Sequence, residues 1–149
     1  MTAETMEGAV PQREAKYRTC LDTGLKVFAS TETLIKWNAV TAVLFLAVGG
    51  LFGIAIALTR WPAVHILPAE WFYLVLTAHG AAVLLFWILF FEMAILYFAS
   101  SVLLNCRLAT PRFAWLGYIL MVVGSLMATV AVLQGESSVM FTSYVPMQA

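Results

Sequence analysis

The sequence predicts an all-α membrane protein whose three membrane-spanning helices form part of a larger helical bundle. Apolar residues make up 62% of the chain and charged residues only 11%, whereas soluble domains are about 45–50% apolar and about a quarter charged. Three apolar stretches each reach the roughly 20 residues that a helix needs to cross a bilayer. The net charge of zero gives no argument for a nucleic-acid partner. No Gly-rich phosphate loop, paired cysteine motif or Ser/His/Asp set is visible in the sequence.

The first 36 residues form a charged N-terminal segment. It lacks the apolar core of a secretory signal and carries five acidic residues, so we do not interpret it as a cleaved leader. Residues 19–36 place Leu21, Leu25, Phe28 and Leu34 among charged residues. This pattern predicts a short amphipathic helix at the membrane interface.

The three predicted spans cover residues 37–59, 71–104 and 113–133. The second is longer than a crossing requires, so we expect it to tilt or to project beyond the bilayer. The first contains Gly49 and Gly53, spaced as in the small-residue pairs that allow membrane helices to pack closely. Two glycines that are merely tolerated in a membrane helix would give the same pattern.

Basic residues predict the orientation. Most of them precede the first span or separate the second from the third: Arg13, Lys16, Arg18, Lys26, Lys36, Arg107 and Arg112. Arg60 is alone in the first loop. Because a basic excess marks the cytoplasmic side, we expect a multi-pass inner-membrane protein with a cytoplasmic N-terminus and an outer tail at residues 134–149. Cys20 and Cys106 then lie on the reducing side, as free thiols.

His79 is the main candidate functional residue, because an ionisable ring at membrane depth is costly. It lies about 10–12 Å below the outer surface at 1.5 Å per residue, and neutral imidazole is a common metal ligand. Gly80 leaves room for a flat ligand, and Thr77 could orient the ring. A hydrogen bond across helices is the alternative. His65, in the outer loop, is expected to be solvated.

Glu92 is the only acid inside a predicted span. It follows His79 by thirteen residues, which turns it about 220° around the helix and places it about 20 Å deeper. A proton route is one interpretation, since intramembrane acids often mark such routes. An acid at the inner interface that hydrogen-bonds a neighbouring helix is the interpretation we favour.

Three motifs, in order, resemble subunit I of the haem–copper oxidases. Leu-Thr-Ala-His-Gly at residues 76–80 is similar to the second helix of that family, which carries an axial histidine of the low-spin haem. Thr-Pro-Arg-Phe-Ala-Trp at 110–115 resembles the entry to its third helix. Phe-Thr-Ser-Tyr-Val-Pro-Met at 141–147 resembles its Tyr-Pro-Pro-Leu segment, although Val145 and Met147 depart from it. The short second loop and the absence of Asp after Asp22 point to the B-type branch or to relatives of the nitric oxide reductases.

The resemblance implies a component of a terminal respiratory oxidase, with His79 as one axial ligand of a low-spin haem of b or a type. The second ligand, the high-spin haem and the copper would be bound elsewhere, so the chain would not be catalytic alone. The implied partners are the remaining helices of subunit I, a subunit II-like electron-entry subunit, lipid, and cytochrome c, another redox protein or quinol as donor. A nitric oxide reductase complex and a haem-free accessory subunit remain as alternatives.

Overall fold

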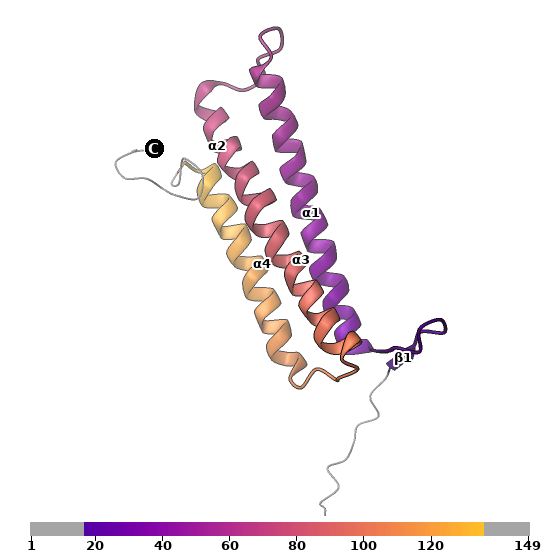
Figure 1. The fold of residues 1–149 in the computed structure, drawn as a ribbon. Helices are drawn as coiled ribbons and strands as arrows, with labels where there is room; N and C mark the ends of the chain where they lie inside the picture. Colours follow the sequence, from indigo (N-terminus) through magenta and orange to yellow (C-terminus); the bar gives the residue numbers. More distant parts are fainter. Residues whose placement is uncertain (1–16, 136–149) are drawn as a thin grey trace, which may run out of the picture.

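The computed structural model describes residues 17–135. A β-hairpin precedes three helical rods that run alternately up and down (Figure 1). The second rod is continuous but contains two π-helical segments, η1 and η2. The elements are β1 (Tyr17–Thr19), β2 (Lys26–Phe28), α1 (Ala29–Arg60), α2 (Ala69–Gly80), η1 (Ala81–Phe86), α3 (Trp87–Tyr97), η2 (Phe98–Leu103) and α4 (Pro111–Leu133).

The predicted fold class is confirmed. The three rods, Ala29–Arg60, Ala69–Leu103 and Pro111–Leu133, are long and apolar enough to cross a membrane, and the protein is a multi-pass membrane protein. The first rod begins at Ala29 rather than at residue 37, because the polar residues before Trp37 continue the helix beyond the apolar stretch. The second rod has 35 residues, about 50 Å of helix against a hydrocarbon core of about 30 Å.

The amphipathic helix expected over residues 19–36 is wrong in its first part. Residues 17–28 form an antiparallel hairpin that pairs Tyr17 with Phe28, and its turn contains Gly24 at a φ of +68°. The aromatic and β-branched residues of the two strands favour extended backbone, and a positive φ suits glycine. The hairpin extends sideways from the lower end of the bundle (Figure 1).

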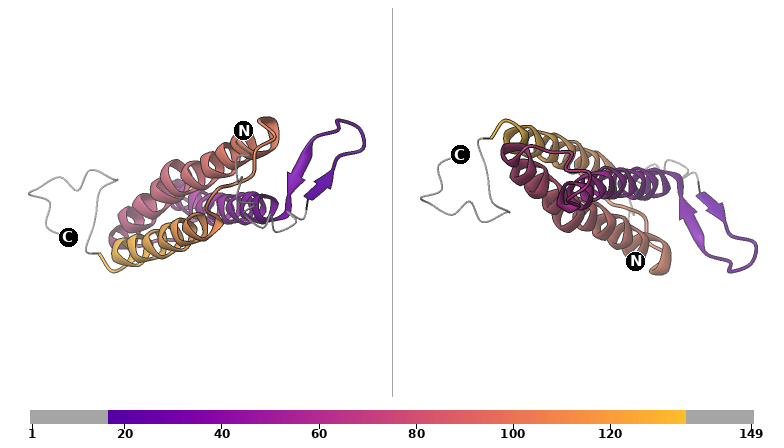
Figure 2. Two further views of the ribbon diagram at one scale, coloured as in Figure 1. Left: turned by 90° about the horizontal axis from the view of Figure 1, so that it is seen from below. Right: turned by 90° about the horizontal axis from the view of Figure 1, so that it is seen from above.

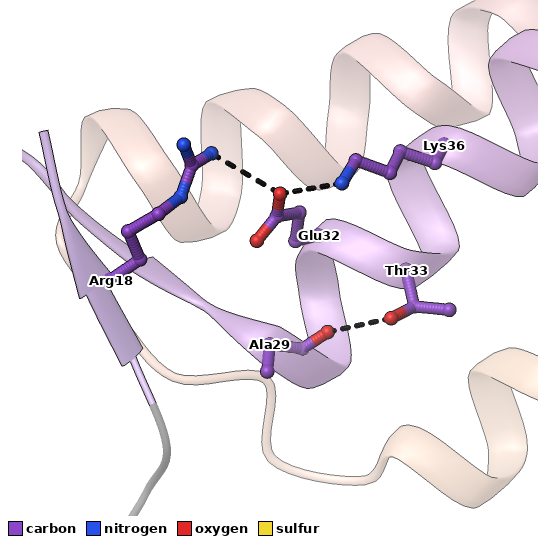
Figure 3. Close-up of polar contacts among 5 residues, drawn as sticks. All are labelled: Arg18, Ala29, Glu32, Thr33 and Lys36. Carbon is purple, nitrogen blue, oxygen red and sulfur yellow. Dashed lines mark hydrogen bonds and ion pairs between the residues drawn. The ribbon is translucent and has the colours of Figure 1, made fainter.

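An ion-pair cluster joins the hairpin to the start of α1 (Figure 3). Glu32 Oε1 lies 3.2 Å from Arg18 Nη2 and 2.7 Å from Lys36 Nζ. Nearby, the Thr33 hydroxyl donates to the carbonyl of Ala29 at 2.8 Å. Because Arg18 and Lys36 are largely exposed, these pairs fix local geometry more than they stabilise the fold.

The three rods contact one another pairwise, and the end-on views show them side by side as a bundle (Figure 2). In the core, Phe45 of α1 packs against Phe86 and Phe90, with ring centroids 5.1 and 5.6 Å apart. Thr41 of α1 hydrogen-bonds the Tyr118 hydroxyl of α4 at 2.7 Å. The apolar ring cluster and the Thr41–Tyr118 hydrogen bond therefore help to hold this part of the bundle together.

Most of the apolar surface remains uncovered within the described residues. Only 11–17% of the residues in the most apolar window of each rod are buried. Large side chains such as Leu44, Leu96 and Met127 are more than half exposed. These faces can lie against lipid or against further membrane helices.

The loop between α1 and α2 folds back onto the end of α1. The Thr59 hydroxyl accepts a hydrogen bond from the Leu67 amide at 3.2 Å, and His65 Nδ1 lies 3.1 Å from the Thr59 carbonyl oxygen. His65 is exposed, as expected, yet it also closes this loop. The motif at 141–147 and the tail beyond Gly135 lie outside the described residues.

Candidate functional site

His79 lies where the α-helical geometry of the second rod changes. It is the penultimate residue of α2, and the π-helical segment η1 begins two residues later at Ala81. Short π-helical segments within α-helices occur frequently at functional sites. The His79 side chain is half-buried and turns toward α1.

A single short hydrogen bond orients the imidazole. Nδ1 of His79 lies 2.7 Å from the carbonyl oxygen of Gly49 on α1. A carbonyl oxygen can only accept, so Nδ1 carries the hydrogen and donates it. In this neutral tautomer Nε2 keeps its lone pair. Histidines that ligate metals usually have this arrangement, with the other ring nitrogen donating to a carbonyl or carboxylate.

Two glycines of α1 make this contact sterically feasible. A Cβ on Gly53 would lie 2.9 Å from His79 Cε1, and one on Gly49 would lie 2.5 Å from Val83 Cγ2. A Cβ on Gly50 would meet nothing within 4 Å. Gly49 and Gly53 are therefore required for close packing against His79 and Val83, whereas Gly50 is merely tolerated.

The second ring nitrogen is available as a ligand atom. Within residues 17–135, Nε2 of His79 has no hydrogen-bond partner, and no buried side-chain nitrogen or oxygen lacks one. Nε2 must therefore be accessible on the surface of the three-helix unit. The described part of the chain contains no group of three or more His, Cys, Asp or Glu side chains placed to hold a metal ion. His79 therefore offers a single ligand atom, Nε2, which suits a metal that takes one bond from these residues, as the iron of a haem would.

Thr77 and Gly80, both predicted to belong to the site, flank His79 on the same helix. Thr77 is 4% exposed, and its hydroxyl donates to the Tyr73 carbonyl at 2.9 Å. The hydrogen bond that orients the ring goes instead from His79 to the Gly49 carbonyl, and the sequence pattern assigns Gly49 only to helix packing. The small-residue spacing of Gly49 and Gly53 was the signal that could have linked α1 to the site.

Glu92 does not join His79. It is exposed on α3, and the two ion pairs among the described residues both involve Glu32 instead. A π-helical segment, Ala81–Phe86, lies between the two residues. The structure thus shows no contact between His79 and Glu92.

Comparison with known proteins identifies the family. Residues 33–149 match the family described as Cytochrome C and Quinol oxidase polypeptide I. The match includes almost all of α1 and the whole of both other rods. Neither the curated proteins nor the solved structures give a match.

The predicted family is confirmed, because the match covers well over half of the chain. The single-ligand geometry at His79 is compatible with the haem that this family binds. The chain belongs to the Cytochrome C and Quinol oxidase polypeptide I family.

Proposed function

We propose that His79 is one axial ligand of the low-spin haem in a haem–copper oxidase that reduces dioxygen. The observation that carries the proposal is the hydrogen bond from Nδ1 to the Gly49 carbonyl, 2.7 Å long. It fixes the tautomer, leaves Nε2 free to bind iron, and makes Nε2 more basic. The family description names oxidases, which favours dioxygen over nitric oxide as the substrate.

Each residue of the site has a stated task in this proposal. His79 supplies the ligand atom, Gly49 holds the ring by its carbonyl, and Gly53 leaves the space that the ring occupies. Thr77 stiffens the turn before His79 by its bond to Tyr73. Gly80 leaves room beside the ring for a flat group. A haem with two imidazole ligands has no open position for substrate and supplies electron transfer.

The rest of the catalytic machinery lies outside the described residues. The second axial ligand, the high-spin haem and the copper come from other helices of polypeptide I, so this segment is not catalytic alone. A subunit II-like partner delivers electrons from cytochrome c, another redox protein or quinol. The extensive exposed apolar surface of the three rods supports their assembly into a larger bundle.

We further propose that the end of the bundle bearing the hairpin faces the cytoplasm. Five described basic residues lie at that end: Arg18, Lys26, Lys36, Arg107 and Arg112. Arg60 alone lies at the other end. This distribution follows the positive-inside rule. In the proposed orientation, His79 would lie in the outer half of the inner membrane.

Replacement of His79 tests the ligand assignment. In the purified oxidase complex, we expect His79→Gly to abolish the low-spin band in reduced-minus-oxidised spectra. Loss of a residue that only hydrogen-bonds a metal ligand already costs about 10–100-fold in metal affinity, and loss of the ligand itself should cost more. Added imidazole should restore the band. His65→Ala, the matched control at the other histidine, should keep it. A normal low-spin band in His79→Gly without imidazole would overturn the assignment.

A further inference from the structure

Glu92 lies in the middle of an exposed apolar stripe on the second rod. Leu85, Leu89 and Leu96 have exposed fractions of 40%, 48% and 59%, and Glu92 is exposed between them. The spacings of seven, three and four residues put all four on one side of a helix. We call these four residues the Glu92 stripe.

No comparable charge interrupts the other outward faces. In α1 from residue 37 to 58, and in α4 from residue 113 to 133, every exposed position is apolar or glycine. Those faces can contact lipid without cost. The Glu92 stripe differs from them by one carboxyl group, so its surroundings must differ as well.

A rod centred in the bilayer would place Glu92 within the hydrocarbon core. The rod spans Ala69–Leu103, and Glu92 is about 9 Å from its midpoint at 1.5 Å per residue. The hydrocarbon core extends about 15 Å to either side of the bilayer centre. Ionisable groups at such depths almost always face protein or a water-filled cavity. A rod centred in the membrane would therefore not expose Glu92 to lipid.

The described residues offer Glu92 no partner. Their basic side chains lie at the ends of the bundle, and the ion pairs they form go to Glu32. A second copy of the chain would not solve the problem, because a two-fold interface would bring two Glu92 stripes together. With both carboxyl groups ionised, such an interface would oppose two negative charges and would supply no donor from the stripe.

We propose that the Glu92 stripe is the docking surface for a membrane-spanning helix of a partner polypeptide, which presents a hydrogen-bond donor or a cationic side chain to Glu92. The leucines supply the apolar contact, and Glu92 fixes the register of the partner helix. Interhelical hydrogen bonds of this kind set which helices pair in membranes. The inference rests on the burial pattern of η1 and α3 and does not depend on a haem at His79.

Photocrosslinking in the intact oxidase complex tests the proposal. Benzoylphenylalanine at Leu89 or Leu96 should give a covalent adduct with another membrane polypeptide, and mass spectrometry should place the link within one helical turn of a donor side chain. Leu120, which is 62% exposed on the apolar face of α4, is the reference position. Adducts only with lipid, or only between two copies of this chain, would refute the docking surface.

Substitution of Glu92 gives an independent measurement. We expect Glu92→Leu to lower the amount of crosslinked partner recovered per chain by about three- to fifteen-fold, the range that interhelical hydrogen bonds support. Glu92→Gln keeps a carbonyl acceptor and should recover within about two-fold. Equal recovery of the crosslinked partner from Glu92→Leu and from the wild type would contradict the proposal. If the Glu92→Leu variant does not accumulate, the crosslinking result from the otherwise wild-type chain tests the docking surface by itself. A His79→Gly complex that keeps the crosslink separates this interface from the haem assignment.

Discussion

The imidazole of His79 owes its orientation to residues 26 and 30 positions away on another helix. Its Nδ1 donates to the Gly49 carbonyl, and the ring lies against the backbone of Gly53. Backbone atoms are a rigid support, because they cannot change rotamer as a side chain can. A glycine on α1 therefore determines how a histidine on α2 presents its ligand atom.

Gly53→Ala should disturb this arrangement, because the new methyl group would lie 2.9 Å from His79 Cε1. We expect a shifted or diminished low-spin haem band in the purified complex. Overpacking of this kind costs about 1–3 kcal/mol. Gly50→Ala, where nothing lies within 4 Å, is the matched control and should leave the band unchanged. An unaltered band in Gly53→Ala would argue against the ring position described above.

At the scale of elements, α4 is attached to α1 by a polar contact inside an aromatic cluster. The Tyr118 hydroxyl bonds Thr41 at 2.7 Å, and the Tyr118 ring contacts Trp37, Phe90 and Trp115 at centroid distances of 6.5, 6.0 and 5.6 Å. The three rods meet at this residue. The hydroxyl adds direction to packing that the rings alone would leave less specific.

Tyr118→Phe isolates the contribution of the hydroxyl, because it keeps the ring contacts. We expect a destabilisation of about 0.6 kcal/mol, the average for interhelical hydrogen bonds measured in membranes. The loss is small because Thr41 can turn to bond a carbonyl of its own helix. Thermal denaturation of the detergent-solubilised complex, followed by circular dichroism, would measure it. Tyr118→Ala also removes the ring contacts and should destabilise the bundle more. Equal destabilisation by the two substitutions would contradict this separation of the hydroxyl and ring contributions.

At the scale of the whole molecule, both cysteines lie at the end of the bundle that carries the hairpin. Cys20 is in the hairpin turn, and Cys106 is in the loop between η2 and α4; both are free thiols. A hydrogen bond from the Thr23 side chain lowers the pKa of the Cys20 thiol, so Cys20 forms the reactive thiolate at lower pH than an ordinary cysteine.

The proposed orientation predicts which side of the membrane these thiols face. A membrane-impermeant maleimide should label Cys20 and Cys106 in inverted vesicles and not in right-side-out vesicles. Val64→Cys, at an exposed position of the opposite loop, should show the reverse pattern. Thr23→Ala should move the labelling of Cys20 to higher pH, because it removes the main cause of the lowered pKa. Labelling of the native cysteines from outside would invert the topology.

Much of this molecule could be predicted from local sequence properties. The three spans follow from hydropathy, since a bilayer requires about 20 apolar residues in each crossing. His79 and Glu92 stand out because ionisable side chains are rare at that depth. The first helix extends beyond the predicted span to Ala29, and a hairpin stands where the pattern predicts the start of an amphipathic helix. Hydropathy does not reveal where a polar helix end stops or where a turn begins.

The sequence alone determined the fold class, the family, and His79 as the candidate ligand, because each depends on residue type and order along the chain. Only the tertiary structure decided that the Gly49 carbonyl accepts the hydrogen bond from His79, that Gly53 makes room for the ring, and that the Glu92 stripe lies outside the bundle. These contacts join helices that are distant in sequence, and a hydropathy pattern holds no information about which face of one helix meets another. The physical reason is that helix packing depends on side-chain shape, and here the absence of two Cβ atoms brings His79 against α1.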